Sequence, residues 1–110
     1  MPKSQQQRST ERLNQKQRSD LRKKLDIEDS IACAERANNC CEVCGLYRPY
    51  EPNSIYSGSM HHGRKKRTEE DRRNRMWHIW LCNCHHTLAH ASDGQIIRAA
   101  CELVIEEREQ

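Results

Sequence analysis

Apolar residues follow a helical pattern in the first third of the chain. The stretch over residues 10–38 contains no glycine or proline, and its apolar residues recur at roughly helical spacing: Leu21, Leu25, Ile27, Ile31 and Ala34. Because one face of an α-helix repeats with this period, the stretch predicts one long helix or two shorter ones, weakly amphipathic. Residues 1–10 are polar and rich in glutamine, and they predict a disordered tail.

Two strands and a short helix are predicted in the middle of the chain. Residues 53–62 alternate loosely between apolar and polar, and residues 76–82 (MWHIWLC) are bulky and apolar. Both segments are typical of strands, and a highly charged loop separates them. Over residues 82–90 we expect a helix, because His86 and His90 then share one face.

The end of the chain predicts a final helix that follows a turn. Ser92, Asp93 and Gly94 form the turn and offer an N-cap. The apolar stripe of the helix, which runs to about residue 107, consists of Ile96, Ile97, Ala100, Cys101, Val104 and Ile105. Together these elements predict a small α+β fold, in which a β-hairpin and a helix form a ββα core between N-terminal and C-terminal helices. We expect a single domain over residues 11–110, with helical residues 11–38, core residues 39–91 and C-terminal residues 92–110.

The composition indicates that the hydrophobic core alone is too small to stabilise the fold. Only 35% of the 110 residues are hydrophobic, phenylalanine is absent and the mean hydropathy is −1.10. A small domain with so thin a core usually needs disulfides or a metal. The seven cysteines are an odd number, no secretory signal precedes them, and a CxxC pair lies near histidines. We therefore expect a metal-stapled protein of the reducing cytoplasm, and no run of residues is apolar enough to span a membrane.

A structural zinc site is predicted from the cysteines. Cys41 and Cys44, followed by Gly45, place two thiolates on a tight knuckle, and a tetrahedral Zn²⁺ needs two more ligands. The available donors are about 40 residues further on: Cys82, Cys84 and His85. Cys82 is expected as the third ligand, with His85 or Cys84 as the fourth.

The histidines predict a second site with different chemistry. His61 and His62 lie at the end of one expected strand, where adjacent residues point to opposite faces. One of them can therefore face the helix and bind a divalent metal with His86 and His90, while the other faces a substrate. A neutral imidazole can take a proton from water at physiological pH, and a nearby ion can polarise a phosphate.

Positive charge is concentrated rather than spread evenly. The net charge is only +3, but basic residues cluster in residues 1–24 and again directly after the histidine pair. Such runs attract polyphosphates and make their binding dependent on salt. The residues of the second run that we expect to bind nucleic acid are Arg64, Lys65, Lys66, Arg67, Arg72 and Arg73.

Residues 41–90 resemble an HNH endonuclease of the His-Me finger (ββα-metal) superfamily, in the subgroup with a structural zinc. Such proteins show CxxCG, then a strand ending in HH or DH, then an N…LCxxCHxxxH stretch. Here CEVCG, Met60-His61-His62 and LCNCHHTLAH supply these parts. The resemblance implies a hairpin and helix that grip one catalytic metal. By position, His61 and His86 would be metal ligands, His90 a third ligand or a phosphate contact, and His62 the general base.

Two positions depart from the family pattern. His85 stands where the second cysteine of the last motif would be, which predicts a Cys3His zinc, or a shifted register with Cys84 as ligand. The middle asparagine falls at Trp77, whose indole is only a donor and cannot replace an amide carbonyl. Asn74, three residues upstream, can serve in the catalytic site if the loop bulges.

The sequence thus predicts a metal-dependent endonuclease that hydrolyses DNA phosphodiester bonds, with double-stranded DNA as its partner. The expected cofactors are a structural Zn²⁺ and a catalytic divalent ion, with Mg²⁺ first and Mn²⁺, Ni²⁺ or Zn²⁺ as alternatives. The alternative is a catalytically inactive, zinc-stabilised module that either binds nucleic acid or serves as an adaptor. A homodimer or a larger nucleic-acid-processing complex fits the amphipathic helices, and the chain is similar to small basic HNH proteins of phages and mobile elements.

Overall fold

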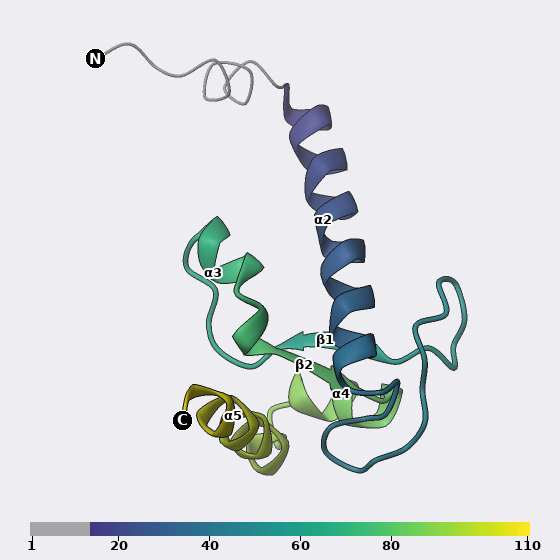
Figure 1. The fold of residues 1–110 in the computed structure, drawn as a ribbon, viewed down its shortest axis with the longest axis vertical. Helices are drawn as coiled ribbons and strands as arrows, with labels where there is room; N and C mark the ends of the chain where they lie inside the picture. The colour runs from purple at the N-terminus through teal and green to yellow at the C-terminus, as the bar shows by residue number, and fades with distance from the viewer. Residues whose placement is uncertain (1–13) are drawn as a thin grey trace.

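The computed structural model describes residues 14–110 and shows a small α+β fold (Figure 1). In chain order its elements are α2 (Gln15–Arg36), β1 (Ser59–His62), α3 (Glu69–Arg73), the 3-10 helix η1 (Arg75–Trp77), β2 (His78–Leu81), α4 (Asn83–Ala89) and α5 (Gln95–Glu109). This confirms the predicted hairpin-and-helix core between N-terminal and C-terminal helices. The tail expected at residues 1–10 lies outside the described residues.

Within the described residues, the N-terminal region forms a single helix, α2. At its start, Asn14 Oδ1 accepts from the N–H of Gln17 at 2.8 Å, and the Asn14 N–H donates to Gln17 Oε1 at 3.0 Å. This reciprocal capping box satisfies two N–H groups that an uncapped helix leaves free. Only the C-terminal half of α2 buries side chains, at Asp29, Cys33 and Ala34, and its N-terminal half extends away from the rest of the molecule (Figure 1).

The hairpin is shorter than the sequence predicts. β1 and β2 pair antiparallel, with Met60 opposite Trp80 and His62 opposite His78. Residues 53–58 form turns instead of strand, with Asn53 in the left-handed region (φ 67°). The second strand begins at His78 because Asn74 Oδ1 accepts from the N–H of Met76 at 3.0 Å and caps the turn of η1.

The loop between the strands contains a helix that was not predicted. Thr68 caps α3, its Oγ1 accepting from the N–H of Asp71 at 3.0 Å. Acidic residues fill the first turn and arginines the last, an order that complements the helix dipole. The run of charges predicted as loop is therefore a short helix with a matched charge pattern.

The buried residues of β2 connect the layers. Ile79 and Leu81 pack with Cys101 and Ile105 of α5, whereas Trp80 packs with Cys33 and Ala34 of α2. This alternation places the hairpin between α2 on one face and α4 with α5 on the other. Gly58 permits the close approach of Trp80, whose Nε1 donates to the carbonyl of Arg48 at 2.7 Å, because a Cβ there would clash with the indole.

Candidate metal centres

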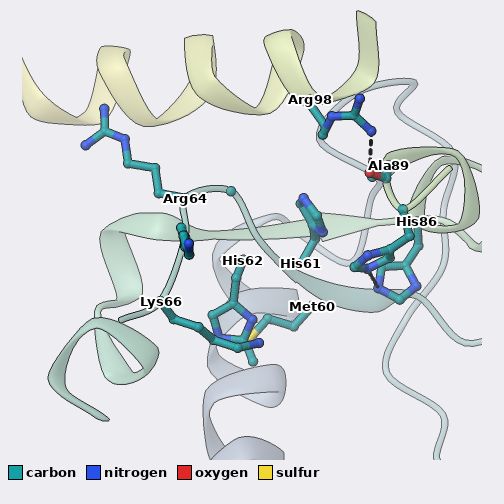
Figure 2. A pocket seen from close by; sticks show the side chains of 11 residues that line it. Met60, His61, His62, Arg64, Lys66, His86, Ala89 and Arg98 are labelled. Carbon is teal, nitrogen blue, oxygen red and sulfur yellow. Dashed lines mark hydrogen bonds between the residues drawn. The ribbon is translucent and has the colours of Figure 1, made fainter. Parts of the chain in front are cut away.

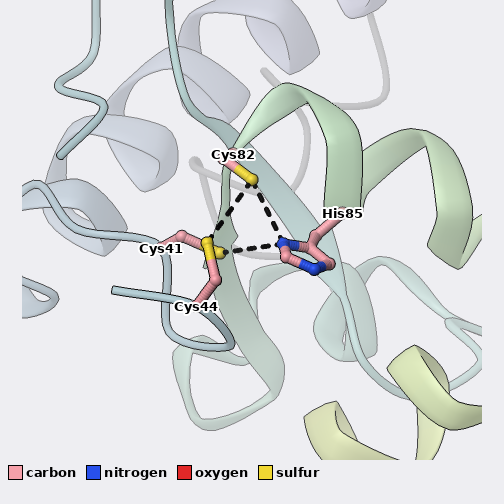
Figure 3. A group of neighbouring side chains, drawn as sticks. All are labelled: Cys41, Cys44, Cys82 and His85. Atoms are coloured by element: carbon pink, nitrogen blue, oxygen red, sulfur yellow. Dashed lines mark hydrogen bonds between the residues drawn. The ribbon is translucent and has the colours of Figure 1, made fainter. Parts of the chain in front are cut away.

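Three cysteines and one histidine converge where the knuckle meets the start of α4 (Figure 3). The knuckle closes through a bond from the Gly45 N–H to the Cys41 carbonyl at 2.8 Å, with Gly45 at a φ of 78°. Cys82 is the N-cap of α4 and His85 lies in its first turn. The four donor atoms, Sγ of Cys41, Cys44 and Cys82 and a ring nitrogen of His85, all lie within 4.8 Å of one another.

The distances in this cluster fit a tetrahedral zinc ion. The Cys44 and Cys82 sulfurs are 3.8 Å apart, and His85 Nδ1 lies 3.2 Å from Cys82 Sγ and 3.8 Å from Cys41 Sγ. Zinc with sulfur ligands at about 2.3 Å and nitrogen at about 2.0 Å gives S–S edges of about 3.8 Å and S–N edges of roughly 3.5 Å. The donor set is therefore Cys3His, and the alternative ligand Cys84 is exposed and outside the cluster.

The ionisation of the thiols also favours a cation at this position. Burial raises the pKa of the Cys41 thiol, but N–H groups of Cys82, Cys44 and Val43 donate to its sulfur and bring the pKa down to about 7. Burial, reinforced by the Cys41 sulfur, raises the pKa of Cys82 to about 11. A positive ion between the two sulfurs would allow both to be present as thiolates.

A second cluster brings together three histidines. His61 projects from β1, and His86 and His90 lie one turn apart on α4; the ring centroid of His61 is 6.1 Å from that of His86 and 5.2 Å from that of His90. The Nε2 atoms of His86 and His90 are 3.3 Å apart, close to the edge of about 3.3–3.4 Å expected between two nitrogens on a tetrahedral zinc. These three residues can hold a metal ion.

His61 has the protonation state and the unsatisfied atom expected of a ligand. Burial and the neighbouring His90 and His86 lower its pKa to about 4, which keeps the ring neutral at pH 7. Its Nδ1 is buried and has no hydrogen-bond partner in the described part of the chain, a costly condition unless another group satisfies the ring. Among the described residues the site contains imidazole and no carboxylate, a donor set that suits zinc, nickel, copper or iron better than magnesium.

The histidine cluster opens into a basic cavity (Figure 2). The cavity has a volume of about 650 Å³ and is lined by both strand histidines, by His86 and His90, and by the basic segment that follows β1. His61 and His62 both reach it although they are neighbours in a strand: His61 lies toward α4, and His62 lies beside Lys66 (Figure 2).

His62 is held by a main-chain carbonyl. Its Nε2 lies 3.3 Å from the Arg72 carbonyl oxygen, which also accepts from His78 Nε2 at 2.9 Å. The two rings meet edge to face, with centroids 5.0 Å apart. Burial, with the charge of Lys66, lowers the pKa of His62 to about 4. Sequence reasoning missed His78, although it becomes the direct partner of His62 once the strands are paired in register.

Asn74 and Trp77 have structural roles. The Asn74 side chain caps η1. Trp77 packs against the core, its carbonyl accepts from the Gly63 N–H at 2.9 Å, and the guanidinium of Arg64 lies over its ring at 5.7 Å. The backbone of Trp77 thereby fixes the chain directly after His62.

Half of the basic residues expected to bind nucleic acid form ion pairs with carboxylates of the protein itself. Arg64 pairs with Glu102 and Glu109 of α5. Arg72 and Arg73 pair with Asp26 of α2, and Arg73 also pairs with Asp29 and Glu69. Lys65, Lys66 and Arg67 remain exposed beside the cavity. The arginines of this run therefore join α3 and the hairpin to the flanking helices.

Within residues 14–110, no helix is both long and apolar enough to cross a membrane. All seven cysteines are free thiols, so the sulfur cluster is not a pair of disulfides. No family model, curated protein or solved structure matches this chain. What the structure itself establishes is a small α+β fold with two clusters that can hold metal ions.

Proposed function

We propose that this protein is a metal-dependent endonuclease that hydrolyses phosphodiester bonds of double-stranded DNA, in the manner of HNH enzymes with a structural zinc. The observation that carries the proposal is the convergence of His61, His86 and His90 on one side of a basic cavity that His62 also lines. A metal site, a neutral base and positive charge are the three components that phosphodiester hydrolysis requires.

His61, His86 and His90 would hold the catalytic ion. When bound, a divalent ion there would polarise the scissile phosphate and stabilise charge on the leaving oxygen. Magnesium was the first expectation from the sequence, but three imidazoles favour zinc, nickel or a similar ion, and the nitrogen–nitrogen spacing of 3.3 Å fits a tetrahedral zinc. An octahedral magnesium ion would place adjacent ligands only about 3.0 Å apart.

His62 is suited to take the proton from the attacking water. Its Nε2–H donates to the Arg72 carbonyl, an assignment that follows from this bond and leaves the Nδ1 lone pair as the basic atom. The lowered pKa keeps the ring neutral at physiological pH and also makes it a weaker base than an imidazole of ordinary pKa. A fixed tautomer and a neutral ring are the conditions under which an imidazole acts as a general base.

Main-chain groups take over the task that the family assigns to its middle asparagine. The Arg72 carbonyl orients the His62 ring, and the Trp77 carbonyl holds the Gly63 N–H next to it. Asn74, expected in the catalytic site, is not required for either contact. The tryptophan at the motif position is therefore compatible with an oriented base.

Lys65 and Lys66 would contact phosphate groups. Both are exposed and line the cavity beside His62. Their ammonium groups can bind phosphate oxygens of any sequence, so they would position the DNA without reading its bases. Cleavage with little sequence preference is the expected outcome.

Plasmid cleavage tests the proposal. Purified protein supplied with Zn²⁺, Ni²⁺, Mn²⁺ or Mg²⁺ should nick supercoiled plasmid, and His62→Ala should lower the rate by about 10²–10⁴-fold. Thr87→Ala, an exposed substitution on α4 outside the cavity, is the matched control and should cleave like the wild type. Equal rates for wild type and His62→Ala with every metal would exclude this mechanism.

The alternative is a catalytically inactive zinc module that binds nucleic acid. Trp77 at the position of the family's asparagine is the observation that favours it. It predicts DNA binding that weakens with salt, no cleavage with any of the four metals, and one bound ion per chain instead of two.

A further inference from the structure

We propose that the metal cavity continues into a basic track that holds the sugar–phosphate backbone of duplex DNA along the N-terminal half of α2. The track is formed by Lys65, Lys66 and Arg67 after β1 and by Arg22 and Arg18 on α2. It rests on the proposed function in one respect, the identity of DNA as the substrate. It adds where the DNA lies and on which side of the metal centre it leaves.

Three adjoining hollows make the track continuous. The first is the metal cavity, which Lys65 and Lys66 line. The second lies between α3 and α2 and is lined by Lys66, Arg67 and Arg22, among others. The third, along α2, is lined by Gln15, Arg18, Ser19 and Arg22. Because Lys66 borders the first two hollows and Arg22 the last two, a polyanion can pass from one to the next without leaving a basic surface.

The part of the track on α2 is a single helix face. Gln15, Arg18, Ser19 and Arg22 are separated by three, four and seven residues, the spacing of side chains that lie above one another on a helix. All four are exposed. Guanidinium, amide and hydroxyl groups are the donors that proteins use for phosphate oxygens, so this face suits a nucleic-acid backbone.

The charge around the track gives the DNA a direction. Of the residues that line the three hollows in the described chain, Glu69 is the one carboxylate, and it pairs with Arg22 at 3.0 Å on the exposed surface. Such a pair stabilises little and can yield to a phosphate. On the other side of the cavity, α5 carries Glu106 and Glu107, and also Glu102 and Glu109, which pair with Arg64. DNA is thus attracted toward α2 more than toward α5.

The N-terminal half of α2 has exposed side chains. Residues 15–24 are all exposed, and the helix projects beyond the hairpin (Figure 1). The ion pairs of Asp26 and Asp29 with Arg72 and Arg73 fix the direction of this projection. The C-terminal half of α2 therefore holds the helix in place, while the N-terminal half presents the face that carries Arg18 and Arg22.

DNA binding by charge-matched variants tests the track. Arg18→Gln/Arg22→Gln removes two positive charges from the track, whereas Lys16→Gln/Lys23→Gln removes two from a different face of the same helix. Both pairs are introduced into the His62→Ala protein, so that the DNA stays intact, and the Kd for a DNA duplex is measured over a range of salt concentrations. Circular dichroism confirms that each variant remains folded.

The track variant should bind about tenfold more weakly, and its plot of log Kd against log salt should be shallower by about one unit per lost phosphate contact. The control pair should change Kd less than about threefold and leave the slope unaltered. Equal losses in both pairs would show that only overall charge attracts DNA, and no loss in either would place the DNA elsewhere. Both results overturn the track.

Glu69→Gln provides a test of opposite sign. Removing the one carboxylate of the track should tighten DNA binding about threefold, and unchanged or weaker binding counts against the proposal. The binding assay tests the track and the cleavage assay tests the nuclease, so the two proposals can be refuted independently. Track-dependent binding without plasmid cleavage would refute the nuclease and keep the track, whereas cleavage by a protein indifferent to Arg18 and Arg22 would keep the nuclease and refute the track.

Discussion

The two metal clusters share one short helix but are enclosed in different ways. His85 and His86 are neighbours on α4 and point about 100° apart, one to each cluster. The cysteine cluster joins a knuckle to the N-terminus of α4 and includes the buried Cys41 and Cys82. The histidine cluster joins β1 to the end of the same helix and opens into the basic cavity.

This difference separates a structural role from a chemical one. With zinc bound, the four ligands of the cysteine cluster would complete a tetrahedron that leaves no position for a substrate, and they would stabilise a fold whose apolar core is small. Three imidazoles would leave at least one position of a bound ion free for a phosphate in the proposed reaction. The same hairpin and helix thus provide a closed cluster suited to maintaining the fold and, under the proposed function, an open cluster suited to catalysis.

The largest effect is expected from removing a ligand of the closed site. Cys82→Ser replaces a side chain that is 2% exposed with a hydroxyl that is a much poorer zinc ligand. Structural zinc contributes about 10–16 kcal/mol in small zinc domains, whereas a whole domain is stable by only about 5–15 kcal/mol. We expect the variant to lose its cooperative unfolding transition in urea, followed by circular dichroism.

Cys84→Ser is the matched control for that variant. The same substitution is made two residues further on, at an exposed position of the same helix. Its unfolding free energy should stay within about 0.5 kcal/mol of the wild type. A cooperative, wild-type-like transition for Cys82→Ser would mean that the cysteine cluster does not support the fold.

Periodicity and ligand spacing were sufficient to predict the parts of the fold that depend on local pattern. The helices over residues 15–36 and 95–109 follow from apolar stripes, and α4 follows from the spacing of its histidines. The sequence narrowed the fourth ligand of the cysteine cluster to two residues. Choosing His85 over Cys84 required the direction in which α4 leaves Cys82, which only the packed structure supplies.

The parts that sequence reasoning missed depend on contacts between distant residues. Arg72 and Arg73 are among the residues expected to bind nucleic acid, but their partners Asp26 and Asp29 lie more than 40 positions away in the chain. His78 had no predicted role. In the hairpin it lies opposite His62, and both rings use the carbonyl of Arg72.

A smaller effect is expected from acid, and it originates in the open site. The pKa of His61 falls from 6.5 to about 4 on folding, chiefly because the ring is buried. The unfolded chain therefore binds the proton more readily, so the stability that neutral His61 contributes is complete above pH 6.5 and lost as the pH falls toward 4. Between pH 7 and pH 5 this loss amounts to about 2 kcal/mol.

Urea unfolding at the two pH values measures this loss, with one equivalent of zinc to fill the cysteine cluster. His61→Phe keeps a ring in the buried position but cannot be protonated, so its unfolding free energy should depend less on pH by about the same 2 kcal/mol. An identical pH dependence in wild type and variant would show that His61 is not buried as a neutral ring.

The smallest effect on the fold is expected from the two less buried ligands of the open site, the half-buried His86 and the exposed His90. His86→Ala/His90→Ala should reduce the bound metal from two ions per chain to one, measured by mass spectrometry of the metals on the purified protein. Because both side chains lie at the open end of α4, the free energy of unfolding should change by only about 1 kcal/mol. The adjacent pair Asn83→Ala/Thr87→Ala has the same spacing on the same helix and should retain both ions.

If the purified wild type contained only one ion per chain, the histidine cluster would hold no metal. If the His86→Ala/His90→Ala variant contained no ion, those histidines would belong to the closed site. One remaining ion in a folded protein is the result that separates the two clusters, because it removes the open site and leaves the closed one intact.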